Sequence, residues 1–201
     1  MKNLKAVTFL SLTIVVTLAG AINPTLSHSF SVALVVPQSG TTLGQGREIV
    51  DGFMLATEER DSHPDQESDG HLGGLDVYVI VIEENGDTTA KIEGAIEQGE
   101  VDIVAIFGSD KILSLVREHL DRRKVALLLP GQSPFAKSDL PEVAVFKSAY
   151  ERKYSAMPSI FAAQGYNAAR RIDAAVRAQS GVGNKALLNR TFRQTAQGFA
   201  W

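Results

Sequence analysis

The chain of 201 residues contains no cysteine, so disulfide bonds cannot stabilise it and its stability must come from burial of a core. It also lacks any excess of positive charge, with 20 Lys and Arg against 23 Asp and Glu. Nothing in this balance attracts nucleic acid or an anionic lipid surface. The sequence has no internal repeat and no low-complexity tract, and its hydrophobic fraction of 44% is that of an ordinary globular domain.

The N-terminus has the layout of a secretory signal peptide. It begins MKNLK, continues as a short apolar stretch and offers small residues for cleavage after Ala21 or after Ser29. The stretch has no stop-transfer flank, which argues against a permanent membrane helix. We prefer cleavage after Ser29. This predicts a signal peptide over 1–29 and a periplasmic domain over 30–201, whose net charge is −5 because two lysines and no acidic residues are removed.

Four short runs rich in Val, Ile and Leu predict strands that are buried on both faces. They span residues 30–37, 75–82, 101–107 and 124–130. Apolar residues at helical spacing lie between these runs, and from Pro141 onward only helical patterns occur. The alternation predicts an α/β fold of three layers: one parallel sheet in the order 2-1-3-4, with helices on both faces and the late helices packed on the same lobe.

The polar segment SHPDQESDGHLGG, residues 62–74, predicts a surface loop. His63 and His71 lie in it among Asp and Glu residues. A weak metal site is the alternative interpretation. However, the histidines of the chain share no ligand spacing, so a solvated acidic loop is favoured and no metal is expected.

Other charged residues are also interpreted as surface. Glu83, Glu84 and Asp87 stand in a turn between a strand and a helix, which predicts a solvated rim. Arg170 and Arg171 share a helix with aromatic and apolar residues, which predicts surface charge beside a packed face.

Two loops stand at the carboxyl ends of the predicted strands. PQSGTTLGQG (37–46) follows the first strand and GSDK (108–111) follows the third. In a doubly wound sheet, ligands bind at this edge, where the strand order reverses. Backbone amides, hydroxyls and the positive end of the helix that starts near Gly44 favour a carboxylate or another small anion. The structural alternative is that these residues only turn the chain and cap helices.

The order and spacing of these segments resemble a known family. FSVALVVPQSGTTLGQGREIVDGFMLATEE, GGLDVYVIVIEENGDTTAK, VDIVAIFGS and VALLLPGQS are similar to the first lobe of type I periplasmic solute-binding proteins of ABC transporters, the leucine/isoleucine/valine-binding type. PEVAVFKSAYERKYSAMPSIFAAQGYNAARRIDAAVRA resembles the late helical segment with which that family returns to its first lobe. The resemblance implies a site in which amides and hydroxyls hold an amino-acid carboxylate. Its candidate residues in this chain are Ser39, Gly40, Thr41, Ser109, Gly131 and Ser133.

The chain departs from this family in one large respect. Fewer than ten residues separate Ser133 from Pro141, where the family inserts an entire second lobe. The acidic residue that pairs with the ligand's amino group in amino-acid-binding members is lost with that lobe, and so is the hinge. Leu43 stands where such members often place an aromatic residue. A half-site leaves its ligand exposed and weakens its polar contacts, so we expect weak binding.

Two enzyme motifs are incomplete. Gly44-Gln45-Gly46 begins a dinucleotide-binding fingerprint, but Ile49 occupies the position of its third glycine. The turn at 131–135 follows a strand as a nucleophile elbow would, but Phe135 replaces the second glycine. We therefore expect neither catalysis nor a cofactor.

Two function classes remain open. The first is a one-lobed solute-binding component of an ABC-type importer, which holds a small carboxylate-bearing solute such as an amino acid and has a permease as its partner. The second is a protein–protein interaction module without transport activity, whose uncovered face meets another subunit or a second copy in a homodimer. A third interpretation is an inactive remnant.

Overall fold

The computed structural model describes residues 28–38, 44–61, 67–131 and 140–196. The elements within them are β1 (Ser29–Val36), α1 (Gln45–Glu58), β2 (His71–Leu72), β3 (Leu75–Glu83), α2 (Thr88–Glu97), β4 (Ile103–Ile106), α3 (Asp110–Arg123), β5 (Ala126–Leu128), α4 (Pro141–Tyr154), α5 (Ile160–Gln179) and α6 (Lys185–Gln194). In these segments no helix combines the length and the hydropathy needed to cross a bilayer.

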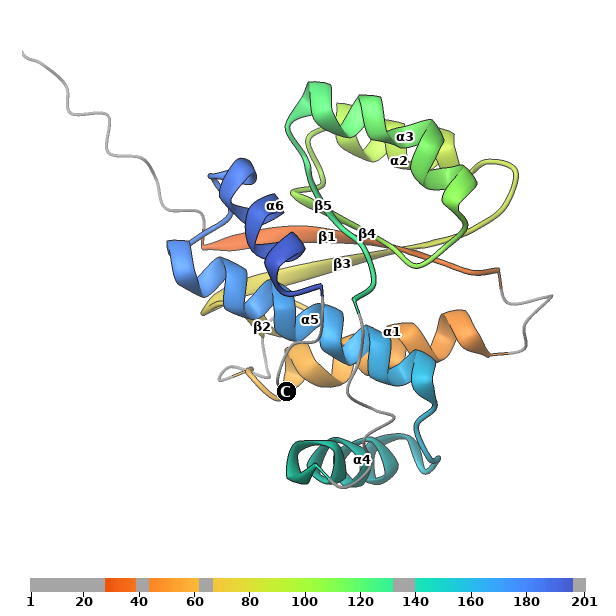
Figure 1. Cartoon of the computed structure of the whole chain (residues 1–201), viewed down its shortest axis with the longest axis vertical. Helices are drawn as coiled ribbons and strands as arrows, with labels where there is room; N and C mark the ends of the chain where they lie inside the picture. The colour runs from red at the N-terminus through yellow and green to blue at the C-terminus, as the bar shows by residue number, and fades with distance from the viewer. Residues whose placement is uncertain (1–27, 39–43, 62–66, 132–139, 197–201) are drawn as a thin grey trace, which may run out of the picture.

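The strands form one sheet in the order β2-β3-β1-β4-β5. β3, β1, β4 and β5 are parallel, which confirms the predicted order of the four long runs, while β2 pairs with β3 in the antiparallel sense. Figure 1 shows α2 and α3 on one face of this sheet and α1 and α5 on the other, with α4 beyond them. The fold is therefore the expected three-layer α/β lobe, and the late helices return to it.

β1 lies at the centre of the sheet, and its side chains divide the core in two. Val32 and Leu34 belong to the cluster packed beneath α1 and α5, whereas Ala33 and Val35 belong to the cluster beneath α2 and α3. All four are fully buried. Because successive side chains of a strand point to opposite faces, a strand covered on both sides must be apolar at every position.

The expectation that each strand is buried on both faces is wrong for β3. Tyr78 and Val81 are 41% and 46% exposed. The physical reason is the sheet order: β2 has only two residues and pairs with the first two residues of β3, so β3 is an edge strand over most of its length. The β-branched and aromatic residues that suggested burial also suit a half-exposed strand.

The interpretation of 62–74 as a surface loop is wrong at its C-terminal end. His71 and Leu72 form β2, and the Leu72 side chain is fully buried in the core. The Thr57 hydroxyl donates to the Asp69 carbonyl (2.6 Å), and the Gly73 amide donates to the Asp173 carboxylate (2.8 Å). These bonds to α1 and α5 fix the segment to the body of the lobe, which its polar composition did not reveal.

α1 and α5 lie side by side and approach each other very closely (Figure 1). A Cβ atom at Gly52 would lie 1.9 Å from the Ala162 carbonyl oxygen, and one at Gly165 would lie 1.9 Å from the Ile49 carbonyl oxygen. Only glycine fits at these two positions. The contact fixes α1, and therefore the start of α1 beside the carboxyl edge of the sheet, against the helix that returns from the end of the chain.

Candidate functional site

The carboxyl ends of β1, β3 and β4 meet at the edge where the sequence predicts a ligand. β1 has β3 on one side and β4 on the other, so the strand order reverses here. A cavity of about 510 Å³ opens at this edge, between the starts of α2 and α3. Its lining residues are Pro37, Gln38, Glu84, Asn85, Gly86, Thr89, Lys111, Ile112 and Leu115.

Ser109 is the N-cap of α3 and stands at this edge. Its backbone N–H donates to Glu84 Oε2 at 2.9 Å, and its hydroxyl donates to Glu84 Oε1. The Glu84 carboxylate therefore rests on the first residues of α3, where free amides and the helix dipole favour a negative charge. A Cβ atom at position 108 would come within 2.5 Å of Glu84 Oε2, so Gly108 is needed for the carboxylate to reach its donors.

This geometry corrects the interpretation of Glu84 as part of a solvated rim. Glu84 is half-buried and bonded, whereas Glu83 and Asp87 are exposed as predicted. The predicted donor Ser109 does hold a carboxylate, but in this structure the carboxylate belongs to the protein. The sequence signal was the position of Glu84, directly after a strand that adjoins β1 in the sheet. Its contact with Ser109 depends on the packing of two loops and could not be derived from spacing.

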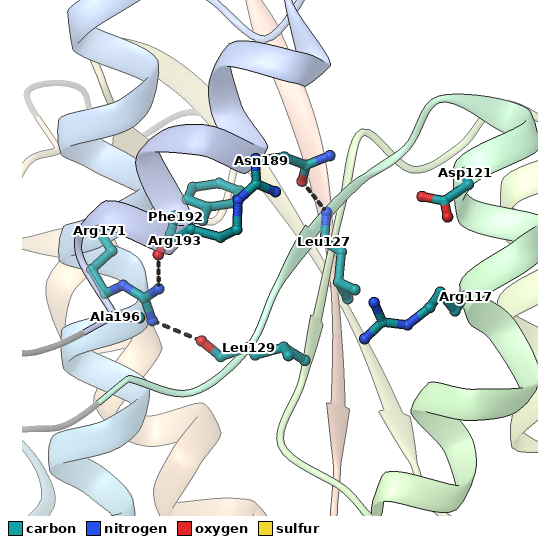
Figure 2. Close-up of a pocket in the computed structure, with 9 residues that line it drawn as sticks. All are labelled: Arg117, Asp121, Leu127, Leu129, Arg171, Asn189, Phe192, Arg193 and Ala196. Atoms are coloured by element: carbon teal, nitrogen blue, oxygen red, sulfur yellow. Dashed lines mark hydrogen bonds between the residues drawn. The ribbon is translucent and has the colours of Figure 1, made fainter.

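The neighbours of Gly131 differ from those of Ser109. A Cβ atom there would lie 2.8 Å from the Ala196 carbonyl oxygen and 3.0 Å from Arg171 Nη1, and both residues line a different cavity beside β5 (Figure 2). The two cavities share no lining residue. Ser39, Gly40, Thr41 and Ser133, the other candidate ligand residues, lie outside the described part of the chain.

The interpretation of Arg171 as surface charge is wrong. The residue is 1% exposed, and three of its N–H groups donate hydrogen bonds. Nε donates to Thr195 Oγ1 (3.0 Å), Nη1 to the Leu129 carbonyl (2.7 Å) and Nη2 to the Phe192 carbonyl (2.6 Å). Burial lowers the pKa of Arg171 to about 10. The missed signal was the surrounding sequence, since a helix rich in Ala and apolar residues on all sides is buried all round.

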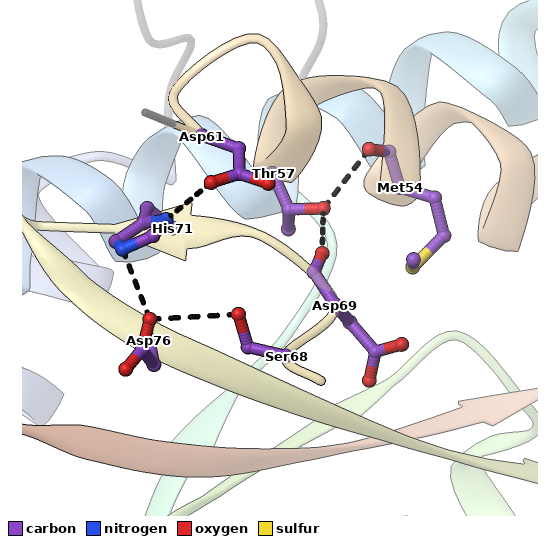
Figure 3. A network of polar contacts seen from close by, with 7 residues as sticks. All are labelled: Met54, Thr57, Asp61, Ser68, Asp69, His71 and Asp76. Carbon is purple, nitrogen blue, oxygen red and sulfur yellow. Dashed lines mark hydrogen bonds and ion pairs between the residues drawn. The ribbon is translucent and has the colours of Figure 1, made fainter. Parts of the chain in front are cut away.

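A second polar cluster joins the end of α1 to the edge of the sheet (Figure 3). The His71 ring lies between two carboxylates, with Nδ1 2.9 Å from Asp61 Oδ1 and Nε2 2.9 Å from Asp76 Oδ1. The Ser68 hydroxyl also donates to Asp76. His71 is only 13% exposed, so its interpretation as a solvated loop residue is wrong. In the described segments no group of three His, Asp or Glu side chains is placed to hold a metal ion.

The comparisons with known proteins rest on structure alone. No family model and no characterised protein sequence matches the chain. An ABC transporter substrate-binding protein from Sphaerobacter thermophilus is similar in structure, with a TM-score of 0.66 at 12% identity over 82% of this chain and 85% of that chain. A protein from Rhodospirillum rubrum described as a branched-chain amino acid ABC transporter is similar at a TM-score of 0.33 and 21% identity, over 81% of this chain and 49% of the other. The first match shows that the fold is that of a substrate-binding protein, as the resemblance implied.

Proposed function

We propose that this chain is a one-lobed solute-binding component of an ABC-type importer and that it binds a small carboxylate-bearing solute, such as an amino acid, at the carboxyl edge of its sheet. The observation that carries the proposal is the bond between Ser109 and Glu84. It supports the proposal because the amide and hydroxyl that the resemblance assigns to a ligand carboxylate are placed to bind one.

The rest of the site belongs to the same proposal. Ser39, Gly40, Thr41 and Ser133 would supply further hydroxyls and amides, and an ABC permease would be the partner. The binding domain would be the lobe of residues 30–201, exported after cleavage of 1–29. Its role is binding and release of the solute rather than catalysis.

Glu84 has a direct consequence for the mechanism. Both of its carboxylate oxygens bond to Ser109, so a ligand carboxylate that binds these donors must first displace them. Displacement costs part of the binding free energy, because the Glu84 carboxylate leaves a helix N-terminus and two hydrogen bonds. Glu84 thus acts as an internal competitor. Together with the exposed half-site, this places the expected dissociation constants in the millimolar range, about −4 kcal/mol.

A thermal melt with a panel of amino acids and short-chain acids tests the proposal. A ligand at about 100 times its dissociation constant stabilises a fold by roughly 2.7 kcal/mol. Ser109→Ala should reduce this shift, and Glu84→Ala should strengthen binding because the competitor is removed. Ser114→Ala is the matched control, since the bond that this exposed serine of α3 makes to a described residue is within its own helix, to the Lys111 carbonyl. A panel at tens of millimolar (about −2 to −3 kcal/mol) that leaves the melting point unmoved would refute solute binding.

One observation favours the interaction module as a second candidate function. Met157 and Ile160 are 63% and 40% exposed, and Leu129 is 37% exposed. The Ser159 hydroxyl donates to Glu48, so the start of α5 adjoins the start of α1, and Leu129 directly follows the carboxyl end of β5. Leu43, Pro134 and Phe135, which the sequence suggests for the same surface, lie outside the described residues. Light scattering that shows a stable dimer or hetero-complex without ligand would favour this function over solute binding.

A further inference from the structure

A small cavity of about 220 Å³ lies along β5, between α3 and α6 (Figure 2). Its apolar floor is formed by Leu127, Leu129 and Phe192. Asn189 of α6 closes one side, and its Oδ1 accepts the outward N–H of Leu127 at 2.8 Å. The edge of the sheet is therefore satisfied by side chains, and what remains open is a pocket with apolar and polar walls.

The charged residues of this cavity are strongly unbalanced. Three arginines line it, Arg117 from α3, Arg171 from α5 and Arg193 from α6, against the single carboxylate of Asp121. Among the described residues, none of these arginines forms an ion pair. Other cations of α5 and α6 do so: Arg177 pairs with Asp173 at 2.9 Å and Lys185 with Asp102 at 2.7 Å.

Arg171 is the most unusual of the three. It is 1% exposed, and its bonds to described residues use three of its five N–H donors and reach only neutral oxygens. Removing a charge from water without a counter-charge is costly, so buried guanidinium groups are normally paired. The Asn189 oxygen already accepts the Leu127 N–H, so the NH₂ group is the part of this side chain that remains to bind a ligand. Apart from Asp121, the polar side chains in the walls thus present donors.

We propose that this cavity binds a small oxyanion, a carboxylate or a phosphate, which Arg117 and Arg193 hold against the buried Arg171. Guanidinium groups suit such ligands because their paired N–H donors match two oxygens of one anion. The cavity shares no residue with the carboxyl-edge site, so this second site does not depend on the proposed function. An anion here would also connect α3 to α6 across β5.

Isothermal titration calorimetry at low chloride tests the site, with sodium phosphate and sodium succinate as separate probes. The informative variant is Arg117→Gln with Arg193→Gln, which leaves the buried Arg171 in place. Its matched control is Arg122→Gln with Arg190→Gln. This variant also removes one arginine charge from each of α3 and α6, but at positions outside the cavity. We expect at least one probe to bind the wild type, the cavity variant to bind about tenfold more weakly or worse, and the control to bind within about twofold of the wild type.

Three results would overturn the proposal. The first is that the wild type shows no saturable binding at about 10 mM of either probe (about −3 kcal/mol). The second is that the control variant loses as much affinity as the cavity variant. The third is that the cavity variant binds as tightly as the wild type. Preference for phosphate or for succinate identifies which oxyanion the site takes. Ser109→Ala should leave this binding unchanged, so failure of the carboxyl-edge proposal and failure of this one are distinguishable. Melting curves of both double variants check that each still folds.

Discussion

Replacement of Gly165 by alanine should destabilise the lobe because α1 and α5 have no room for a side chain between them. The new Cβ atom would lie 1.9 Å from the Ile49 carbonyl oxygen, and an ordinary contact begins near 3.4 Å, so the helices would have to separate by about 1.5 Å. The obstacle is backbone, which cannot rotate away as a side chain can. Both helices contribute to the main core cluster, so separation would also loosen the packing of Ile49 and Phe53.

The magnitude follows from two opposed effects. Alanine is favoured over glycine inside a helix by about 1 kcal/mol. Overpacking a well-packed core costs about 1 to 3 kcal/mol and occasionally more, and a contact this short with backbone lies at the upper end. We therefore expect a net loss of about 2 kcal/mol in the free energy of unfolding, which is a large share of the 5 to 15 kcal/mol typical of a domain.

Urea unfolding of matched variants measures this loss. Gly94→Ala in α2 is the control, because a Cβ atom there meets nothing closer than the flexible end of Gln98 at 3.8 Å. It should raise the urea midpoint, by up to about 1 kcal/mol in stability, while Gly165→Ala lowers it with an unchanged m-value. If the two variants shift the midpoint in the same direction and by similar amounts, the close approach of α1 and α5 is not what constrains this position.

Two further predictions concern buried polar groups. Burial raises the pKa of Tyr150 from 10 to about 12, so the folded state holds this proton more tightly and stability should fall as pH rises from 10 to 12. Tyr150→Phe should flatten that fall, by up to about 1.4 kcal/mol per pH unit, in unfolding curves taken at each pH. Asn189→Ala should cost about 1 to 3 kcal/mol, because the Leu127 N–H at the edge of β5 loses its acceptor. Arg190→Ala on the same helix should change stability by less than about 0.5 kcal/mol, and an equal loss there would show that the edge bond is unimportant.

The sheet could be predicted because its determinants are local and periodic. Continuous Val, Ile and Leu runs alternate with helical spacing, and connection handedness then allows few topologies. The predicted runs at 30–37 and 75–82 match β1 and β3 to within one residue at each end, whereas those at 101–107 and 124–130 exceed β4 and β5, which have four and three residues. The residues that flank β4 and β5 include Val101, Phe107, Val125 and Leu129, which are as apolar as the strands themselves. Composition therefore does not locate the ends of these strands.

Features that depend on partners distant in sequence could not be predicted. β2 consists of two residues in a polar segment, and its position requires bonds to α1 and α5. Arg171 has the composition of a surface residue, and only the packing of α6 and the end of β5 around α5 buries it. In both cases the local signal, polarity, indicates the surface, whereas the decisive contacts lie between 12 and 100 residues away.

The candidate site was half predictable for the same reason. Its location follows from strand order, and Ser109 follows from the expected loop. The state of the site does not follow, because Glu84 reaches Ser109 from a different loop, 25 residues away.

Two sets of polar groups that an external partner could have bound are hydrogen-bonded instead to residues of the lobe itself. At the carboxyl edge, Glu84 occupies the donors at the start of α3, and at the outer edge of β5, Asn189 and Arg171 bond to Leu127 and Leu129. These two sets of hydrogen bonds differ in how readily they can be broken. The Ser109–Glu84 contact is solvent-exposed and can open for a competing carboxylate, whereas release of Arg171 would leave a buried cation without its hydrogen bonds. Exchange with a solute is therefore energetically accessible at the carboxyl edge, while an anion beside β5 would have to bind to an intact arrangement of arginines.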